Sequence, residues 1–246
     1  MSNRPRDLDD AALLDLVQRQ TFRYFWDFSH PASGLARERS NSAFGYGQEV
    51  VTTGGSGFGV MAIIIAVERG WISRRDAVSH LLKAVRFLGK ADSYHGVFPH
   101  FLNGDTGRTI PFSRKDDGAD IVETSFLMTG LLCARQYFAG TEAHEAELRN
   151  RINGLWLDVE WNWHTRGNAN VLYWHWSPNN DWSMNHEVRG WNECVIAYVL
   201  AAASPRYPIS ADVYYRGWAQ GRHFKNGRAF YGTELPLGPD YGGPLF

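Results

Sequence analysis

The 246-residue sequence has few of the features that mark several classes of protein. Its two cysteines, Cys133 and Cys194, lie in apolar runs without CxxC spacing, so neither a disulfide framework nor a zinc site is indicated. The 25 basic and 26 acidic residues nearly cancel, which argues against a nucleic-acid partner. The longest purely apolar run, residues 60–67, is much shorter than the ~20 residues of a membrane span. The polar N-terminus has no signal-peptide core, so we expect a cytoplasmic protein, or a periplasmic or secreted one if this N-terminus is not native.

Apolar periodicity predicts two kinds of helix that alternate along the chain. Amphipathic helices are predicted at residues 7–29, 73–88, 141–159 and 210–224, and helices that are apolar on every side at 56–69, 120–138 and 185–203. Each apolar helix is followed by a short turn and preceded by a long loop, at residues 30–55, 92–119 and 160–184. This order predicts helical hairpins with all long loops on one rim.

The spacing of the apolar helices predicts an all-α, (α/α)6-toroid-like fold that is incomplete. About three and a half hairpins fit into the chain, whereas six would need roughly 390 residues at this period. Residues 1–246 are therefore expected to form a single domain that lacks its C-terminal part. A short β-hairpin is predicted at residues 95–112, with Asn103, Gly104 and Gly107 in its turn.

Aromatic residues are abundant, and seven of the ten tryptophans lie between Trp156 and Trp191. Indole faces stack on sugar rings, while sugar hydroxyls bind Asp, Asn, Arg and His. One group of three could equally pack beneath the loop: Trp156, Trp161 and Trp163. We expect the other four to form a binding surface: Trp174, Trp176, Trp182 and Trp191. His175, in the same loop, supplies a polar partner.

Acidic residues cluster around the start of the helix predicted at 120–138. We assign Asp117 to helix capping, which leaves Asp116, Asp120 and Glu123 for chemistry, the last two on one helix face. Paired carboxylates on a rim lined by indoles are typical of a glycosidase, in which one acid protonates the leaving oxygen and another activates water or attacks the sugar.

Glu193 is predicted to lie two turns into the helix at 185–203, between Trp191 and an apolar run. Apolar surroundings disfavour the ionised carboxyl, so Glu193 is a candidate general acid. The alternative is a buried salt bridge to Arg189 or to an arginine from another helix. Glu187, in the first turn of that helix, could be a partner of the helix dipole.

Other motifs indicate no cofactor and no metal. The glycines of residues 52–60 form neither a phosphate-binding nor a dinucleotide motif and are better explained by close packing of a helix. The histidines lack metal-ligand spacing. A polysaccharide lyase on the same toroid stays open as an alternative, with candidates for charge neutralisation and proton abstraction at Arg39, Arg189, Tyr46 and His175.

Five long segments, residues 22–40, 52–74, 100–127, 171–205 and 230–246, resemble the bacterial glucoamylase-like family, which is related to the endo-β-1,2-glucanases and has an (α/α)6 barrel. The resemblance implies hydrolysis of a glucan, and the related endo-β-1,2-glucanases imply a β-1,2 linkage. It also implies Glu193 as general acid and places Asp116, Asp120 and Glu123 in the cleft. We expect the substrate to be bound by Trp174, His175, Trp176, Trp182, Glu187, Arg189, Trp191, Arg39 and Tyr46. Family members continue through further helices, so a non-catalytic glycan-binding fragment is a second reading.

Overall fold

The computed structural model describes residues 7–40, 47–219 and 227–234. Its helices are α1 (Asp10–Trp26), α2 (Thr53–Glu68), α3 (Arg74–Leu88), α4 (Ile121–Tyr137), α5 (Ala143–Asp158) and α6 (Val195–Ala203), with a short 3-10 helix η1 (Trp161–Thr165) and a π-helical turn η2 (Val213–Trp218). Its strands are β1 (Val50–Thr52), β2 (Phe101–Asn103), β3 (Thr109–Ile110), β4 (Ala119–Asp120), β5 (His175–Trp176), β6 (Ala229–Phe230) and β7 (Thr233–Glu234). The structure is mostly helical, as predicted. Within the described residues, no helix combines the length and apolarity that crossing a membrane requires.

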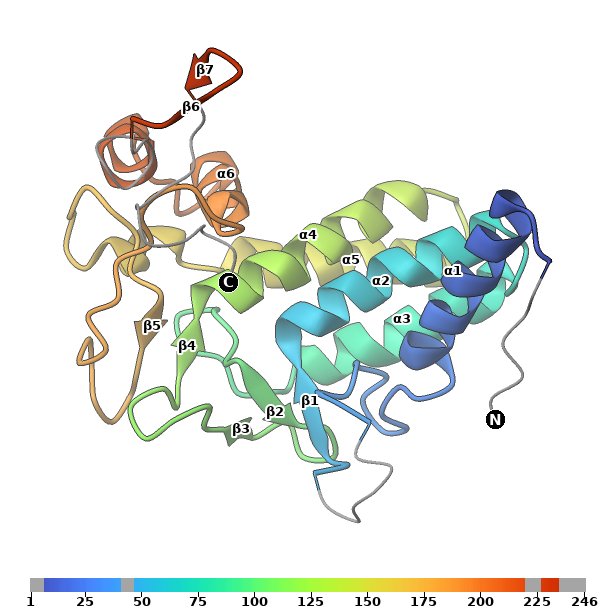
Figure 1. Cartoon of the computed structure of the whole chain (residues 1–246). Helices are drawn as coiled ribbons and strands as arrows, with labels where there is room; N and C mark the ends of the chain where they lie inside the picture. The colour runs from blue at the N-terminus through green and yellow to red at the C-terminus, as the bar shows by residue number, and fades with distance from the viewer. Residues whose placement is uncertain (1–6, 41–46, 220–226, 235–246) are drawn as a thin grey trace.

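The helices form two layers with the alternation that the sequence predicts. The inner layer places α4 between α2 and α6, while α3 packs against α5 in the outer layer and α1 packs on α2. Strands β1 to β5 gather at the end of the molecule where α2 and α4 begin (Figure 1). Long segments precede α2, α4 and α6, whereas short turns follow α2 and α4. The long loops therefore share one rim, and they carry the candidate site.

Local capping explains where several helices begin. Asp9 accepts a hydrogen bond from the backbone N–H of Ala12 at 2.8 Å, so α1 begins at Asp10. The Oγ of Ser73 accepts from the N–H of Asp76 at 3.1 Å, so α3 begins at Arg74. Helix α2 begins at Thr53, so Gly54 and Gly55, which were expected at the end of the preceding loop, lie inside it.

The predicted helix at 185–203 is wrong over its first ten residues, because α6 begins only at Val195. Residues 185–194 bond to a neighbouring segment instead. The N–H of Val188 donates to the carbonyl of Leu172 at 2.8 Å, and the N–H of Trp174 donates to the carbonyl of His186 at 2.9 Å. Asn185 also has φ 46°, outside the helical region. Of the helix predicted at 210–224, residues 213–218 form η2, and residues 220–224 lie outside the described residues.

Glycines allow α2 and α4 to cross at close range. A Cβ on Gly57 would lie 2.1 Å from the carbonyl oxygen of Phe126, and a Cβ on Gly130 would lie 2.3 Å from the carbonyl oxygen of Gly57. A side chain at either position would therefore force the two backbones apart. This contact confirms close helix packing as the reason for these glycines.

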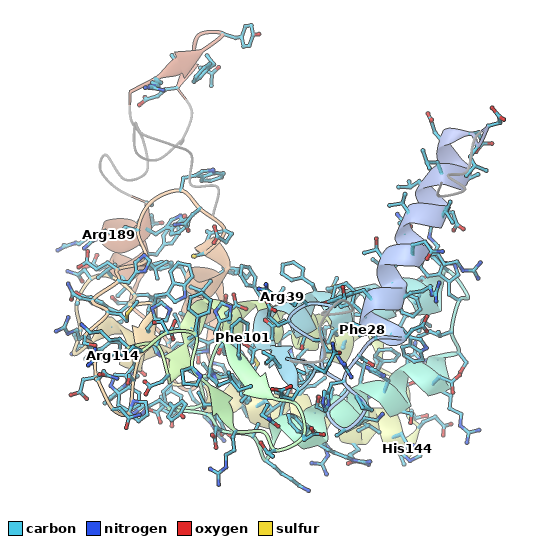
Figure 2. All side chains as sticks on the ribbon, turned by 60° about the horizontal axis from the view of Figure 1, so that its bottom comes forward. Phe28, Arg39, Phe101, Arg114, His144 and Arg189 are labelled. Carbon is cyan, nitrogen blue, oxygen red and sulfur yellow. The ribbon has the colours of Figure 1, made fainter. Side chains whose placement is uncertain are left out.

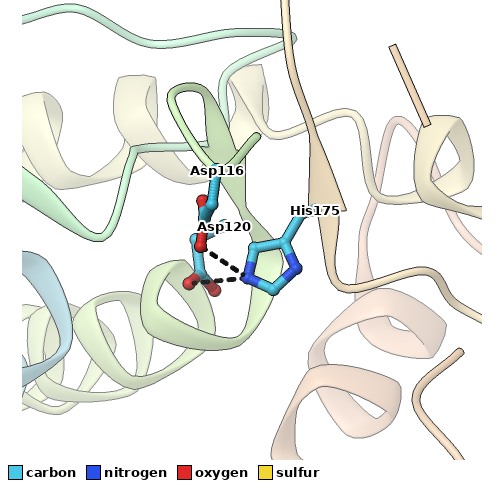
Figure 3. Close-up of side chains that lie close together, drawn as sticks. All are labelled: Asp116, Asp120 and His175. Carbon is cyan, nitrogen blue, oxygen red and sulfur yellow. Dashed lines mark ion pairs between the residues drawn. The ribbon is translucent and has the colours of Figure 1, made fainter. Parts of the chain in front are cut away.

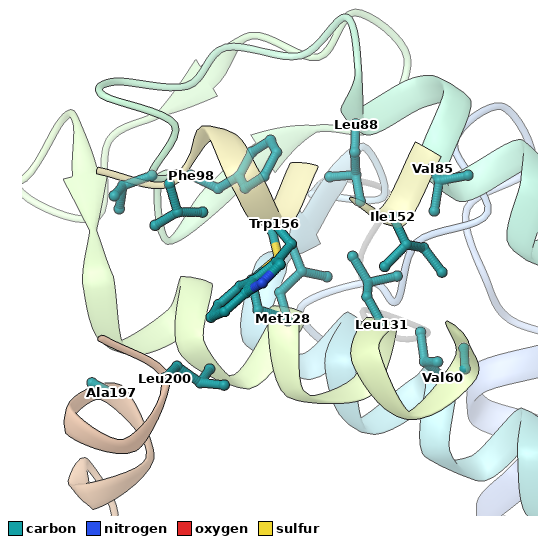
Figure 4. Packing of buried hydrophobic residues seen from close by; sticks show 14 of the residues in the cluster. Val60, Val85, Leu88, Phe98, Met128, Leu131, Ile152, Trp156, Ala197 and Leu200 are labelled. Carbon is teal, nitrogen blue, oxygen red and sulfur yellow. The ribbon is translucent and has the colours of Figure 1, made fainter. Parts of the chain in front are cut away.

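The hydrophobic core lies between the inner and outer layers (Figure 4). Val60, Met128 and Leu131 from the inner helices meet Val85 and Ile152 from the outer ones. The inner helices are apolar on every side, and such a helix is expected to be buried all round. The structure differs over part of their surface, because Phe58 on α2 is 58% exposed and Ile65 and Val199 are also exposed.

The predicted hairpin is confirmed as β2 and β3, which pair antiparallel. In its turn, the Asn103 side-chain oxygen accepts from the backbone N–H groups of Asp105 and Thr106, each at 3.0 Å. Strand β1, which the sequence did not predict, pairs with β2 on its other edge, with Thr52 opposite Phe101. This small sheet forms one wall of the candidate site.

Candidate active site

Two short strands bring together residues that lie far apart in the sequence. Strands β4 and β5 pair antiparallel, with Asp120 opposite His175 and Ala119 opposite Trp176. Gly118 permits this close approach, since a Cβ there would lie 2.4 Å from the carbonyl oxygen of Trp176. Directly opposed residues project their side chains to the same face of a sheet. The pairing therefore brings the His175 imidazole to the Asp120 carboxylate.

His175 bridges two buried carboxylates. Its Nε2 lies 3.0 Å from Oδ2 of Asp116 and 3.7 Å from Oδ2 of Asp120 (Figure 3). Asp116 is 4% exposed and Asp120 is fully buried, and the His175 side chain is itself only 10% exposed. Two carboxylates repel each other strongly where water is excluded, and an imidazole N–H between them offsets that repulsion.

Asp120 has a second function, because it caps helix α4. Its Oδ1 accepts hydrogen bonds from the backbone N–H groups of Val122 and Glu123, each at 3.0 Å. These bonds and the helix dipole stabilise a negative charge at this position. Its Oδ2 is left to face the histidines, since Nδ1 of His100 lies 3.1 Å away.

The capping role predicted for Asp117 therefore belongs to Asp120. The Asp117 carboxylate instead ties two loops together, because it accepts from the Ser177 hydroxyl and from Nδ2 of Asn179, the latter at 2.7 Å. These bonds hold the pKa of Asp117 below its usual range although partial burial opposes them.

Glu123 projects from the first turn of α4 toward the N-terminal end of α2. Its Oε2 accepts from the N–H of Gly54 at 3.1 Å, and a Cβ on Gly54 would lie 2.2 Å from that oxygen. Burial, followed by the negative charge of Asp120, raises the pKa of Glu123 to about 7, against the opposing charge of His100. Glu123 can therefore hold a proton near neutral pH, as a general acid must.

Glu123 lines an open cavity of about 630 Å³, a volume in the usual range of small-molecule sites. The aromatic part of the wall is formed by Phe101, Phe112 and His100, with ring centroids of His100 4.4 Å from Phe101 and 4.6 Å from Phe112. Arg39 and Phe101 both contribute to this wall (Figure 2). Apolar ring faces beside charged groups are suited to a sugar.

The structure separates Glu193 from the helix interior that the sequence predicted for it. Glu193 lies in the loop before α6 and is partly exposed. The prediction that a buried helix surrounds its carboxyl with apolar side chains is therefore wrong. The alternative salt bridge to Arg189 is also not formed, because the Arg189 guanidinium pairs with Glu187, which accepts from the Tyr173 hydroxyl at 3.1 Å. The catalytic role of Glu193 and the substrate-binding roles of Glu187 and Arg189 stay predictions.

The first three tryptophans of the cluster divide between core and surface. Trp156 and Trp161 are buried, which confirms packing beneath the loop for both. Trp163 is 37% exposed and stacks on His95, with ring centroids 3.8 Å apart.

The four tryptophans predicted to bind substrate do not line the cavity beside Glu123. Trp174 stacks on the rings of His175 and His186, and Trp191 is exposed. Trp176 follows His175 in β5 and points to the opposite face, where its ring contacts Trp163 edge to face. Trp182 packs near the same ring, with centroids 6.4 Å apart. Their part in substrate binding stays a prediction.

Arg39 and His100 both line the cavity, but the sequence singled out only Arg39. Arg39, predicted to bind substrate, does line the cavity and pairs with Glu38. Tyr46, predicted with it, lies outside the described residues. His100 was missed, because no local spacing links it to Asp120.

Asp116, Asp120 and His175 also form a set that could hold a metal ion, since one ligand atom from each lies within 4.8 Å of the others. The Nε2 of His175 lies 3.0 Å from Oδ2 of Asp116, so direct ion pairing between these side chains accounts for the arrangement without a metal ion. The expectation of no metal stays a prediction.

Comparison with known proteins agrees with this architecture. A family model described as "Putative glucoamylase" matches residues 185–246. A "putative glucoamylase" structure from Bacteroides uniformis is 56% identical with a TM-score of 0.90, over 96% of this chain and 57% of that one. An endo-β-1,2-glucanase from Chitinophaga pinensis, in complex with sophorotriose and glucose, is 50% identical with the same TM-score and the same coverage.

A curated relative has a matching name. The exo β-1,2-glucooligosaccharide sophorohydrolase (non-reducing end) of Parabacteroides distasonis is 44% identical over 97% of this chain. The chain spans 35% of that protein and somewhat over half of the two solved structures. The family-model match and the similarity over nearly all of its length show that this chain is homologous to part of glucoamylase-like proteins, among them a β-1,2-glucanase.

Proposed function

We propose that this chain acts as a glycoside hydrolase on β-1,2-linked glucose oligosaccharides or glucan. The observation that carries the proposal is a carboxyl, Glu123, that lines an open cavity and has a pKa of about 7. The substrate class is supported by two relatives, 44% and 50% identical, whose names specify β-1,2-glucan or its oligosaccharides. Since the chain spans only part of each relative, activity and substrate are both proposals for this chain.

Glu123 is the group that the geometry favours as proton donor. In the proposed step its proton passes to the glycosidic oxygen as the bond from that oxygen to the anomeric carbon breaks. Water then adds to the anomeric carbon, and its proton goes to a second carboxylate. The resemblance to the family implies Glu193 as the acid instead, so the two carboxyls compete for one role.

Release of reducing ends tests the proposal. The purified chain is incubated with β-1,2-glucan and sophorotriose, and with β-1,3-, β-1,4- and α-1,4-linked glucans as controls for linkage. Cleavage of the β-1,2 substrates alone supports the proposal, and no cleavage of any substrate contradicts the activity.

Three variants then assign the acid. Loss of a general acid lowers turnover by about 10²- to 10⁴-fold, so Glu123→Gln is expected to fall in that range. Glu142→Gln, on an exposed residue at the start of α5, is the matched control and should keep full turnover. Full activity of Glu123→Gln with loss of activity in Glu193→Gln would transfer the role to Glu193.

Glycan binding without cleavage is the second candidate function. It is favoured by the coverage of the relatives, because a second carboxylate could come from a part of them that has no counterpart here. Calorimetric titration with sophorotriose separates the two candidates. Heat of binding without release of reducing ends supports the binding function, whereas release supports hydrolysis.

A further inference from the structure

His100 is a wall residue of the cavity that has no part in the steps above. It precedes β2, its ring lies against Phe101 and Phe112, and its side chain is 23% exposed. Its Nδ1 lies 3.1 Å from Oδ2 of Asp120. One side of the imidazole therefore faces a buried carboxylate, while the residue as a whole borders open space.

Asp120 cannot turn away from His100. Its Oδ1 is engaged by two backbone N–H groups at the start of α4, which leaves Oδ2 for the histidines. His175, held at 3.0 Å by Asp116, lies 3.7 Å from the same Oδ2 on its other side. An ionised carboxylate only accepts hydrogen bonds, so Nδ1 of His100 must carry the hydrogen.

The other ring nitrogen of His100 is left for a ligand. Nε2 lies across the ring from Nδ1, and no hydrogen-bond partner for it exists among residues 7–40, 47–219 and 227–234. Nε2 does not belong to the side-chain atoms that are both buried and without a partner, so it is open to a ligand. Since His100 and Glu123 line one cavity, Nε2 is available beside the carboxyl that carries the proposed acid chemistry.

We propose that His100 is a substrate-binding residue whose Nε2 forms a hydrogen bond with a hydroxyl group of the glucose unit bound beside Glu123. This inference rests on the proposed function for its ligand, a neutral oligosaccharide. Asp120 is the positioning residue that orients the imidazole through Nδ1, and His175 with Asp116 holds Asp120 in place.

The electrostatics of the site favour a hydrogen on the side of the imidazole that faces Asp120. Burial alone would lower the pKa of His100, but the hydrogen bond and charge of Asp120, together with Glu123 and Asp116, raise it overall. With hydrogen on Nδ1, the Nε2 of a neutral imidazole accepts and that of a protonated one donates, and a sugar hydroxyl can pair with either because it both donates and accepts.

Two substitutions separate the nitrogens. Asn at position 100 places its amide nitrogen near the site of Nδ1 and leaves nothing at Nε2, whereas Gln can reach the site of Nε2. For binding of sophorotriose, measured by calorimetry, His100→Asn is expected to weaken affinity about tenfold or more, and His100→Gln about threefold or less. His144 is an exposed residue of α5 and lies well away from the cavity (Figure 2). His144→Asn is therefore the control and should bind like the parent chain.

The outcomes distinguish this inference from the proposed function. If the parent chain binds no β-1,2-linked oligosaccharide, the proposed function fails and the inference fails with it. If the parent chain binds and His100→Asn binds equally well, the inference alone is overturned.

A spectroscopic test covers the case in which a variant does not fold. Imidazole nitrogen NMR of the parent chain is expected to show hydrogen on Nδ1 of His100 and a change at Nε2 when sophorotriose is added, with no change at His144. In Asp120→Asn, the cap keeps the amide oxygen toward the helix, so the amide nitrogen faces His100 and the hydrogen should move to Nε2. A bare Nδ1 in the parent chain, or a silent Nε2 on addition of sugar, overturns the inference.

Discussion

His175 and Asp120 face each other across the two-stranded β4–β5 sheet, and the His175 Nε2 lies between the buried carboxylates of Asp120 and Asp116. The same pairing turns Trp176, the next residue, to the opposite face. One pair of two-residue strands thus decides which side chains of the tryptophan-rich loop meet the acidic cluster and which do not.

Removal of His175 should destabilise the fold strongly. In His175→Ala two buried carboxylates lose the N–H between them, so the free energy of unfolding is expected to fall by about 3 kcal/mol. His175→Gln keeps a donor near Nε2 and should lose about 1 kcal/mol. Urea unfolding at pH 7 measures both, and an unchanged midpoint for His175→Ala would show that the bridge contributes nothing.

Glu123 should make stability depend on pH with a definite sign. Its folded pKa of about 7 lies above the ordinary value of 4.5, because burial and Asp120 oppose ionisation more than His100 favours it. The stabilising contribution of this group is therefore fully present below pH 4.5 and lost as pH rises through 7.

Glu123→Gln removes this ionisation and should be more stable than the parent chain at pH 8, on the order of 2 kcal/mol, with the advantage shrinking toward pH 5. Thermal unfolding across this pH range measures the difference, and Glu142→Gln is the exposed control. A difference that grows as the pH falls would contradict the raised pKa.

The α2–α4 crossing should not tolerate a side chain. Gly57→Ala would bring its Cβ against the backbone of α4, so a loss of about 2–3 kcal/mol is expected. Gly154→Ala, within α5 and with nothing within 4 Å of the new Cβ, is the matched comparison and should gain about 0.5–1 kcal/mol. Chemical unfolding of the pair measures the contrast, and similar effects at both positions would argue against a close crossing.

Aromatic substitutions should separate packing from sugar binding. Phe112 lines the cavity, so Phe112→Ala is expected to weaken sophorotriose binding about tenfold. Trp176 packs on His95 and Trp163 at the opposite face of β5, so Trp176→Ala should lower the melting temperature with little change in affinity. Calorimetry measures the affinity of the two variants, and thermal unfolding measures their stability. Loss of binding in Trp176→Ala but not in Phe112→Ala would assign sugar binding to Trp176 instead.

Much of the fold follows from local patterns. Helices α1, α3, α4 and α5 lie where apolar periodicity predicts them, because this pattern acts within a few residues. Residues 185–194 are the exception. They directly precede the apolar run of α6, but backbone hydrogen bonds hold residues 186–188 beside residues 172–174, a pairing that no local pattern specifies.

The acidic cluster was likewise predictable as a set of residues but not as an arrangement. Asp116, Asp120 and Glu123 stand out because more acids gather at this helix start than a cap needs. Which of them caps the helix, which is buried and which reaches a cavity depends on neighbours from β5, α2 and the β1–β3 sheet. The charge state of each group depends on those neighbours as well.

The sequence by itself determined that the chain is helical, that its long loops meet on one rim and that carboxylates and aromatic rings gather there. Tertiary structure alone decided that His175 bridges Asp116 and Asp120, and that Glu123 and His100 share the open cavity. The physical reason is range: periodicity and capping act between near neighbours in the chain, whereas burial and hydrogen bonds between distant segments exist only once the strands have paired.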